Sequence, residues 1–159
     1  MNENEDTVDA VIGWDQYEME VLAMCLDKHK VNRDIPSPIL RDYQWTGIYK
    51  PMEHQRTTAS FLSIRRRAFC FNEAGTGKTS AALWAADYLM KQGLVKRVLV
   101  ICPVSIMYTA WQDEVFKSVM HLSCGVAHGS KTKRAKVIGG DYEIVVINYD
   151  GVGLSLIHI

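Results

Sequence analysis

The chain has 159 residues, of which 48% are hydrophobic and 23% charged, a composition typical of an ordinary soluble protein with one buried core. No apolar run approaches the roughly 20 residues of a membrane span, and the acidic start is unlike a secretion signal. The net charge of zero conceals an asymmetry, because the first 27 residues hold eight Asp or Glu and no Lys or Arg, whereas the rest is basic. A basic body is typical of proteins that bind polyanions, although a solvated surface has the same composition.

Cysteine and histidine patterns argue against disulfides and structural metal sites. The four cysteines form no CxxC pair, and the five histidines show no HExxH spacing. Cys70 and Cys102 fall inside apolar stretches, where buried reduced thiols are favoured. We therefore expect a cytoplasmic protein of a bacterium or phage-infected host, or a nuclear one in a eukaryote. The expected metal is Mg²⁺ that arrives with a nucleotide.

The first 40 residues form an acidic leader in which one helix is expected. Apolar side chains recur at helical spacing and predict a helix over 14–29: Trp14, Tyr17, Val21 and Met24. The Pro-Ser-Pro run over 36–38 ends this pattern, because proline removes a main-chain donor and favours extended backbone. Residues 41–159 then form one domain, in which a proline can open a second helix over 51–64.

The most informative segment is the run FNEAGTGKT, which ends at Thr79 and predicts a phosphate-binding loop. Gly75 and Gly77 allow the main chain to turn tightly and aim its N–H groups at an anion. Lys78 can reach the β- and γ-phosphates of a nucleotide, and the Thr79 hydroxyl can ligate Mg²⁺. The general pattern has a first glycine where this chain has Asn72, so the signature is shortened to GxGKT.

The segments around the loop support this interpretation. The apolar run over 68–71 predicts a short buried strand before the loop. Residues 80–92 contain no Pro or Gly and predict a helix, which Gly93 ends. Strand, glycine turn and helix are the arrangement that a phosphate-binding loop requires.

Strands and helices continue to alternate downstream. A β-branched strand is predicted over 97–102, and Ser105 can cap a following helix. The apolar side chains of that helix align on one face: Met107, Trp111, Val115 and Val119. Further strands are predicted over 124–127 and 143–149. Apolar strands that alternate with helices predict an α/β fold whose mostly parallel sheet is covered by helices on both faces.

In this order, the segments resemble the N-terminal RecA-like domain of superfamily 2 helicases, and most closely the SNF2-related group. The loop is similar to that family's motif I, where DEMGxGKT is common, with Asn72 and Ala74 as departures. The run KPMEHQ, which ends at Gln55, is similar to the upstream segment whose glutamine recognises adenine. A carboxamide has the donor and the acceptor to pair with adenine, and the alternative is a glutamine on a helix surface.

Two further runs resemble nucleic-acid contacts of the same family. The run VICPVS looks like motif Ia, which places Pro103 and Ser105 beside a nucleic-acid backbone, where main-chain N–H groups can hold a phosphate. The run INYD is similar to motif Ib and places Asn148 and Tyr149 on the same side. The basic run HGSKTKR between them either touches DNA or forms a solvated helix face.

The resemblance implies a RecA-like P-loop NTPase domain of the α/β class, incomplete at its C-terminus, that uses ATP and Mg²⁺. Catalytic roles fall to Lys78 and Thr79, and Thr79 is the expected Mg²⁺ ligand. The residues that hold the nucleotide are Gln55, Gly75, Thr76, Gly77, Lys78 and Thr79. The implied partner is DNA, or else RNA, and no membrane is expected.

The family's Asp-Glu-x-His/Asp element and the later motifs of a second RecA-like domain, including an arginine that stabilises the transition state, have no counterpart here. We therefore expect a truncated chain that binds ATP weakly and hydrolyses it negligibly without that second domain. The implied function is the ATP-binding part of an SNF2-like DNA-dependent ATPase or helicase that translocates on nucleic acid. Two alternatives are another P-loop motor, such as a viral DNA-packaging ATPase, and a non-catalytic nucleotide-binding fragment.

Overall fold

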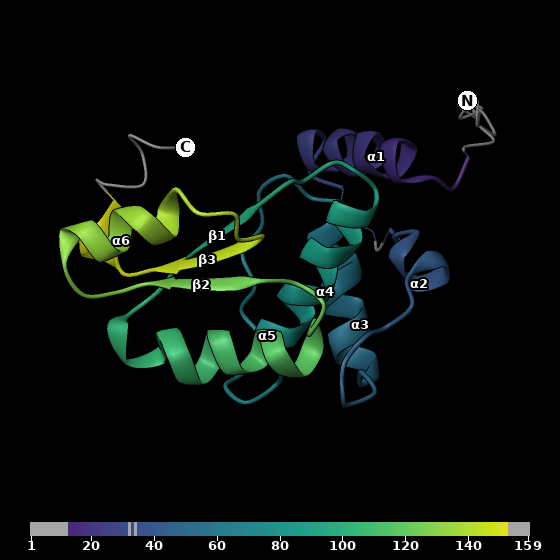
Figure 1. The fold of residues 1–159 in the computed structure, drawn as a ribbon. Helices are drawn as coiled ribbons and strands as arrows, with labels where there is room; N and C mark the ends of the chain where they lie inside the picture. Colours follow the sequence, from purple (N-terminus) through teal and green to yellow (C-terminus); the bar gives the residue numbers. More distant parts are fainter. Residues whose placement is uncertain (1–12, 32, 34, 153–159) are drawn as a thin grey trace, which may run out of the picture.

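The computed structural model describes residues 13–31, 33 and 35–152 of the chain. It is a mixed α/β structure in which helices surround a parallel sheet (Figure 1). The α-helices are α1 (Gln16–Lys28), α2 (Ile39–Asp42), α3 (Glu53–Ser63), α4 (Lys78–Lys91), α5 (Asp113–Ser118) and α6 (Lys131–Ile138). In the described part of the chain, no helix is long and apolar enough to cross a membrane.

The sheet consists of β1 (Val98–Ile101), β2 (Cys124–Ala127) and β3 (Ile144–Ile147), in the spatial order β1-β3-β2. Both pairings are parallel, and all four residues of the central strand β3 are buried. Residues Ile101, Ile147 and Ala127 are partners in register, so the three strands end at the same edge. The segments that follow the strands therefore lie next to one another at that carboxyl edge.

Helices cover both faces of this sheet, as the sequence predicts. On one face, Val100, Ile144 and Val146 pack in a core that includes residues of α4 and α5. On the other face, Val145 and Ile147 pack against α6. Figure 1 shows α5 and α6 on opposite sides of the strands. Alternate side chains of β3 thus serve two cores, which explains its unbroken apolar sequence.

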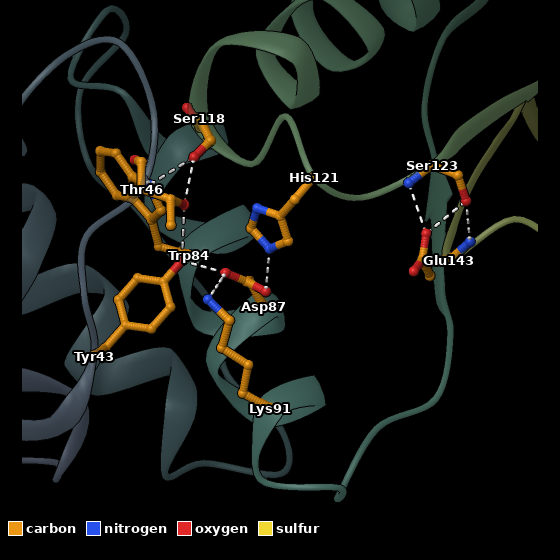
Figure 2. Close-up of polar contacts among 9 residues, drawn as sticks. All are labelled: Tyr43, Thr46, Trp84, Asp87, Lys91, Ser118, His121, Ser123 and Glu143. Atoms are coloured by element: carbon orange, nitrogen blue, oxygen red, sulfur yellow. Dashed lines mark hydrogen bonds and ion pairs between the residues drawn. The ribbon is translucent and has the colours of Figure 1, made fainter.

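The start of the sheet is fixed by a reciprocal contact between β2 and β3, drawn on the right of Figure 2. The Glu143 carboxylate accepts hydrogen bonds from the main-chain N–H and the hydroxyl of Ser123, each at 2.6 Å. These bonds lower the pKa of Glu143 below its ordinary value. The Glu143 N–H in turn donates to the Ser123 hydroxyl at 3.1 Å. The pair therefore pins the register of the two strands at their amino ends.

Helix α1 forms where the sequence predicts it, but its buried face differs from the expected one. Asp15 caps the helix by accepting from the Glu18 N–H at 2.9 Å. Met19 and Ala23 are the apolar residues that α1 buries, against Ile35 and Ile64. The stripe that predicted the helix is exposed: Trp14, Tyr17, Val21 and Met24. Spacing established the helix, whereas the contact with α3 decided which side is covered.

The strand predicted over 68–71 is not formed, which corrects the sequence analysis. Phe69 and Phe71 are 81% and 89% exposed, and their rings stack on each other with centroids 5.7 Å apart. Cys70 is only half-buried. A strand needs main-chain hydrogen bonds to a neighbour, and the strands described here pair with one another instead. Apolar composition alone therefore did not produce a strand at this position.

The segment after β1 is also more irregular than predicted. A 3₁₀ turn over Val104–Ile106 leads into a π-helical stretch over Met107–Gln112, and only then does α5 begin. Ser105 lies inside the 3₁₀ turn, and Pro103 occupies the capping position, so the predicted Ser105 cap is wrong. The predicted apolar face is confirmed, since Met107, Val115 and Val119 are fully buried.

A buried carboxylate joins three parts of the fold, as Figure 2 shows. Asp87 of α4 is 1% exposed and accepts from the Tyr43 hydroxyl at 2.6 Å and from Lys91 Nζ at 2.9 Å. His121 Nε2, from the loop after α5, lies 2.8 Å from its other oxygen. Burial alone would raise the pKa of Asp87, but these three hydrogen bonds together lower it below its ordinary value. Asp87 is therefore held as a carboxylate.

Candidate nucleotide-binding site

The loop that precedes α4 has the backbone geometry expected of a phosphate-binding loop. Gly75 and Gly77 adopt φ values of +80° and +74°, a left-handed conformation that residues with a Cβ rarely adopt. At Gly77 a Cβ would also collide with the side-chain nitrogen of Gln55. Both glycines are thus favoured by their backbone conformation, and a Cβ at Gly77 would in addition displace the Gln55 amide.

Helix α4 begins immediately after this turn, at Lys78, with no side-chain cap. Ala81 donates the first main-chain bond of the helix, to Gly77 O at 3.1 Å. The N–H groups of Lys78, Thr79 and Ser80 precede it and belong to the part of a helix that has no intrahelical acceptor. Together with the helix dipole, they form a ready anion site.

The Thr79 hydroxyl lies in the first turn of α4, where it would ligate a Mg²⁺ ion that a bound triphosphate brings with it. In the described residues, no group of three or more His, Cys, Asp or Glu side chains could hold a metal ion by itself. This donor set fits Mg²⁺, which keeps several water ligands and commonly takes one or two protein oxygens plus phosphates.

Lys78 is folded back over the loop. Its Nζ donates to the main-chain oxygens of Asn72 and Glu73, each at 2.7 Å. An ammonium group has three donors, so one remains for a phosphate oxygen without breaking either bond. The loop therefore positions the ammonium above the glycine turn before any ligand binds.

Gln55, the residue that the resemblance assigns to adenine recognition, lies against the same loop. Its Oε1 accepts from the Met52 N–H at 2.9 Å, and its Nε2 donates to Thr76 O at 3.4 Å. A carboxamide can donate twice and accept twice, so one donor and one acceptor stay free. That remaining capacity matches the adenine edge, which accepts at N7 and donates at N6.

A cavity of about 310 Å³ adjoins Gln55, near the lower limit of small-molecule pockets. Its walls include Tyr49, Trp84 and Glu114. Trp84 is fixed by its indole N–H, which donates to Thr46 O at 2.9 Å, as seen in Figure 2. Tyr49, which is 69% exposed, presents an aromatic ring here. Sequence reasoning missed Tyr49, although an aromatic residue just before the segment predicted to contact adenine was the available signal.

The four residues predicted to contact nucleic acid gather at the carboxyl edge of the sheet. Pro103 and Ser105 follow β1 and are exposed, and Tyr149, which follows β3, is 64% exposed. Asn148 is 9% exposed, and its Nδ2 donates to Asp150 Oδ2 at 3.2 Å. Its side chain therefore supports the turn after β3. The nucleic-acid contacts themselves stay a prediction.

Two further side chains at this edge were not singled out from the sequence. Tyr108 is 44% exposed, and its hydroxyl lies 3.4 Å from Nδ1 of His128, which follows β2. The two rings meet edge to face with centroids 6.0 Å apart. Tyr108 was missed because it lies in a helix that was judged by its apolar face. This edge thus combines aromatic and hydrogen-bonding groups from all three strand ends.

A glycine turn that leads directly into a helix, beside a parallel sheet with helices on both faces, is typical of P-loop nucleotide-binding domains, although the strand that usually precedes the loop is not formed here. Comparison of the sequence with known families agrees with this class. The chain belongs to the family described as "Type III restriction enzyme, res subunit", which it matches over residues 37–156. No curated protein sequence matches the chain.

Solved structures similar to this chain include two of a SWI2/SNF2 ATPase core. The SWI2/SNF2 ATPase core of Sulfolobus solfataricus in complex with dsDNA is 25% identical, with a TM-score of 0.55 over 67% of this chain. A second structure, of the same ATPase core domain, is 24% identical with a TM-score of 0.55 over 70% of the chain. The chain spans 23% of the length of each. The resemblance to SNF2-related superfamily 2 helicases is therefore confirmed, as is the RecA-like α/β fold.

Proposed function

We propose that this chain is the ATP-binding part of a DNA-dependent ATPase that moves along nucleic acid. The observation that carries the proposal is the loop before α4, where two left-handed glycines, a folded-back Lys78 and the open N-terminus of α4 converge. Triphosphates are the anions that such loops bind in proteins of this class. Membership of the family also favours an enzyme that hydrolyses ATP.

In this proposal each part of the site has one task. The main-chain N–H groups of Gly75, Thr76 and Gly77 surround the phosphates, and Lys78 neutralises their charge. Thr79 holds Mg²⁺ against them, and this ion would shield the charge that develops as the terminal phosphate leaves. Gln55 reads the adenine edge. Tyr49 offers its ring for stacking on the base.

DNA is the proposed track. The similar SWI2/SNF2 core has been solved with dsDNA. The carboxyl edge of the sheet, where Pro103, Ser105 and Tyr149 are exposed, is the proposed contact surface. Main-chain N–H groups at the start of the 3₁₀ turn and a tyrosine suit phosphate and sugar contacts, which position a protein without reading sequence. An RNA track would use the same groups.

A second RecA-like domain is proposed to complete the motor, because the chain spans 23% of the length of its structural neighbours.

We also propose the division into an acidic leader over residues 1–40 and an ATP-binding domain over 41–159. Within the leader, Trp14 Nε1 donates to Pro36 O at 2.8 Å, and Gln16 Nε2 donates to Ser63 O of α3 at 2.7 Å. The leader helix is therefore packed on the domain that carries the site.

Replacing Gln55 with Ala is expected to weaken MgATP binding by roughly tenfold while leaving MgGTP binding nearly unchanged. Each hydrogen bond to the base contributes about 0.5–1.5 kcal/mol, and 1.4 kcal/mol corresponds to about a factor of ten. Guanine presents O6 and N1–H in place of the adenine amino group, so it does not offer Gln55 the same pairing. Titration calorimetry with both nucleotides measures the ratio.

Gln92→Ala is the matched control, since Gln92 is exposed at the far end of α4. It should leave both affinities as in the unchanged protein. Equal losses of ATP and GTP affinity in Gln55→Ala would show that Gln55 supports the loop but does not read the base. The proposed base site would then be wrong.

The isolated chain is expected to hydrolyse ATP at a rate roughly a thousandfold below that of a two-domain motor, with or without DNA. A transition-state arginine from a partner domain commonly accounts for about 10³–10⁵ in rate. Asp150, the acid that follows β3, is occupied by the Asn148 carboxamide. Phosphate release, measured with and without duplex DNA, tests this. Turnover at the rate of an intact motor would contradict this expectation. If a longer chain that includes the second domain binds ATP but shows no DNA-stimulated hydrolysis, the non-catalytic alternative is favoured.

A further inference from the structure

Helix α3 contacts the phosphate-binding loop through a second side chain beside Gln55. His54 Nε2 lies 3.0 Å from Thr76 O, closer than the 3.4 Å of the Gln55 amide. A carbonyl oxygen can only accept, so Nε2 must carry the proton. His54 is therefore the nearer of two donors on one loop carbonyl.

The direction of that carbonyl decides where the next N–H points. A trans peptide is planar, so its C=O and the following N–H point in opposite directions. Because His54 holds Thr76 O toward α3, the Gly77 N–H is turned to the opposite side of the loop. Gly77 at φ +74° and Gly75 at φ +80° give the loop this turn, and the Thr76 hydroxyl braces it by donating to Glu73 O at 2.9 Å.

The start of the loop is anchored to the same helix. Asn72, which replaces the glycine of the general pattern, donates from Nδ2 to the Thr58 hydroxyl at 2.8 Å. The Thr58 hydroxyl in turn donates to His54 O at 2.8 Å, which keeps its lone pairs facing Asn72. Helix α3 thus holds the loop at both ends, by Asn72 and by Thr76.

We propose that His54 is a positioning residue of the nucleotide site, which aims the Gly77 amide at the phosphates by holding the carbonyl of Thr76. The proposal rests on the proposed function of the loop. Since His54 acts on the phosphate end of the site, its removal should weaken all ligands that carry a triphosphate equally, whatever their base. This distinguishes it from Gln55, whose loss should change the preference for adenine.

The test compares three variants with two main probes, MgATP and inorganic tripolyphosphate with Mg²⁺, and uses MgGTP to follow the preference for the base. His54→Leu should weaken both probes by the same factor, of about five to twenty, and leave the ATP-to-GTP ratio unchanged. His54→Gln should retain most of the affinity, because its amide nitrogen reaches a similar distance and can donate to the same carbonyl. His29→Leu is the matched control, since His29 is an exposed histidine at the end of α1.

A direct readout is the amide signal of Gly77 in a ¹⁵N correlation spectrum of the ligand-free protein. It should shift in His54→Leu and return toward its original position in His54→Gln. If the Gly77 amide signal keeps its position in His54→Leu and the tripolyphosphate affinity is also unchanged, the proposal is overturned. If instead Lys78→Ala also leaves both probes unaffected, the proposed function of the loop itself is wrong, so the two failures are distinguishable.

Discussion

Lys78→Ala is expected to lower the affinity for MgATP by roughly a hundredfold and to leave the fold intact. A hydrogen bond between an ammonium and a charged acceptor contributes about 1.5–3 kcal/mol, and 2.7 kcal/mol corresponds to about two factors of ten. The side chain is already placed over the loop by two main-chain acceptors, so little ordering is left for the ligand to induce. Calorimetry or a fluorescent ATP analogue measures the change.

The structure offers a matched control and a sharper variant. Lys136→Ala removes the same charge from the exposed side of α6 and should leave ATP affinity unchanged. Lys78→Arg should not restore binding, because a planar guanidinium cannot make the two main-chain contacts and reach the phosphate with the same geometry. Unaltered ATP affinity in Lys78→Ala would remove the main support for a nucleotide site.

The second large effect is on stability, and it concerns Asp87. Asp87→Ala is expected to lower the free energy of unfolding by about 2–3 kcal/mol, because the buried Tyr43 hydroxyl loses its acceptor at 2.6 Å and keeps only the Thr46 hydroxyl at 3.2 Å. Lys91 and His121 are 46% and 40% exposed, so water can hydrate them once the carboxylate is removed. The cost therefore stays below that of breaking a fully buried ion pair. Thermal unfolding should shift by about 5–10 °C.

The pH dependence of this effect has a definite sign. The pKa of Asp87 is below its ordinary value of 3.8 in the folded protein, so the unfolded chain takes up the proton first as the pH falls. The stability that Asp87 contributes is therefore complete above about pH 5, begins to decline near 3.8 and is lost as the pH falls further, through the lower pKa of the folded protein. Urea unfolding at pH 7 and pH 3.5 should show a smaller difference between the variant and the unchanged protein at the lower pH.

Two controls make the Asp87 result interpretable. Asp141→Ala removes an exposed carboxylate and should change stability by less than about 0.5 kcal/mol. Tyr43→Phe removes one donor only and should cost about half as much as Asp87→Ala. If Asp87→Ala is as stable as the unchanged protein at pH 7, the network of Figure 2 does not stabilise the fold.

The nucleotide loop was predictable from the sequence because its chemistry is local. Gly75 and Gly77 were assigned a turn that few other residues permit, and both have positive φ. Lys78 and Thr79 then follow by their position at the start of the helix. Gln55 came from resemblance alone, and its contact with the loop joins residues 21 apart in the chain. Its neighbour His54 carried no local signal, because a histidine on a helix is compatible with many surfaces.

What the sequence could not supply depends on partners far away in the chain. Asp87 lies in a helix rich in Ala and Leu, and its role follows only from Tyr43 and His121, 44 and 34 residues away. Lys91, four residues later on the same helix, was the one local sign that Asp87 forms an ion pair. Helix α1 was found by its spacing, yet the stripe that revealed it faces water. Periodicity establishes that a helix forms, and only packing decides which side is covered.

The stacked rings of Phe69 and Phe71 have a consequence for handling the protein. They lie outside the strands of the sheet, and within the described residues β1 pairs with β3 alone. Exposed aromatic surface and a free strand edge are the two features that promote aggregation of β-containing proteins. We therefore expect copies of this chain to associate through residues 68–71 and the outer edge of β1 at high concentration. A lysine that raises solubility would be placed there first.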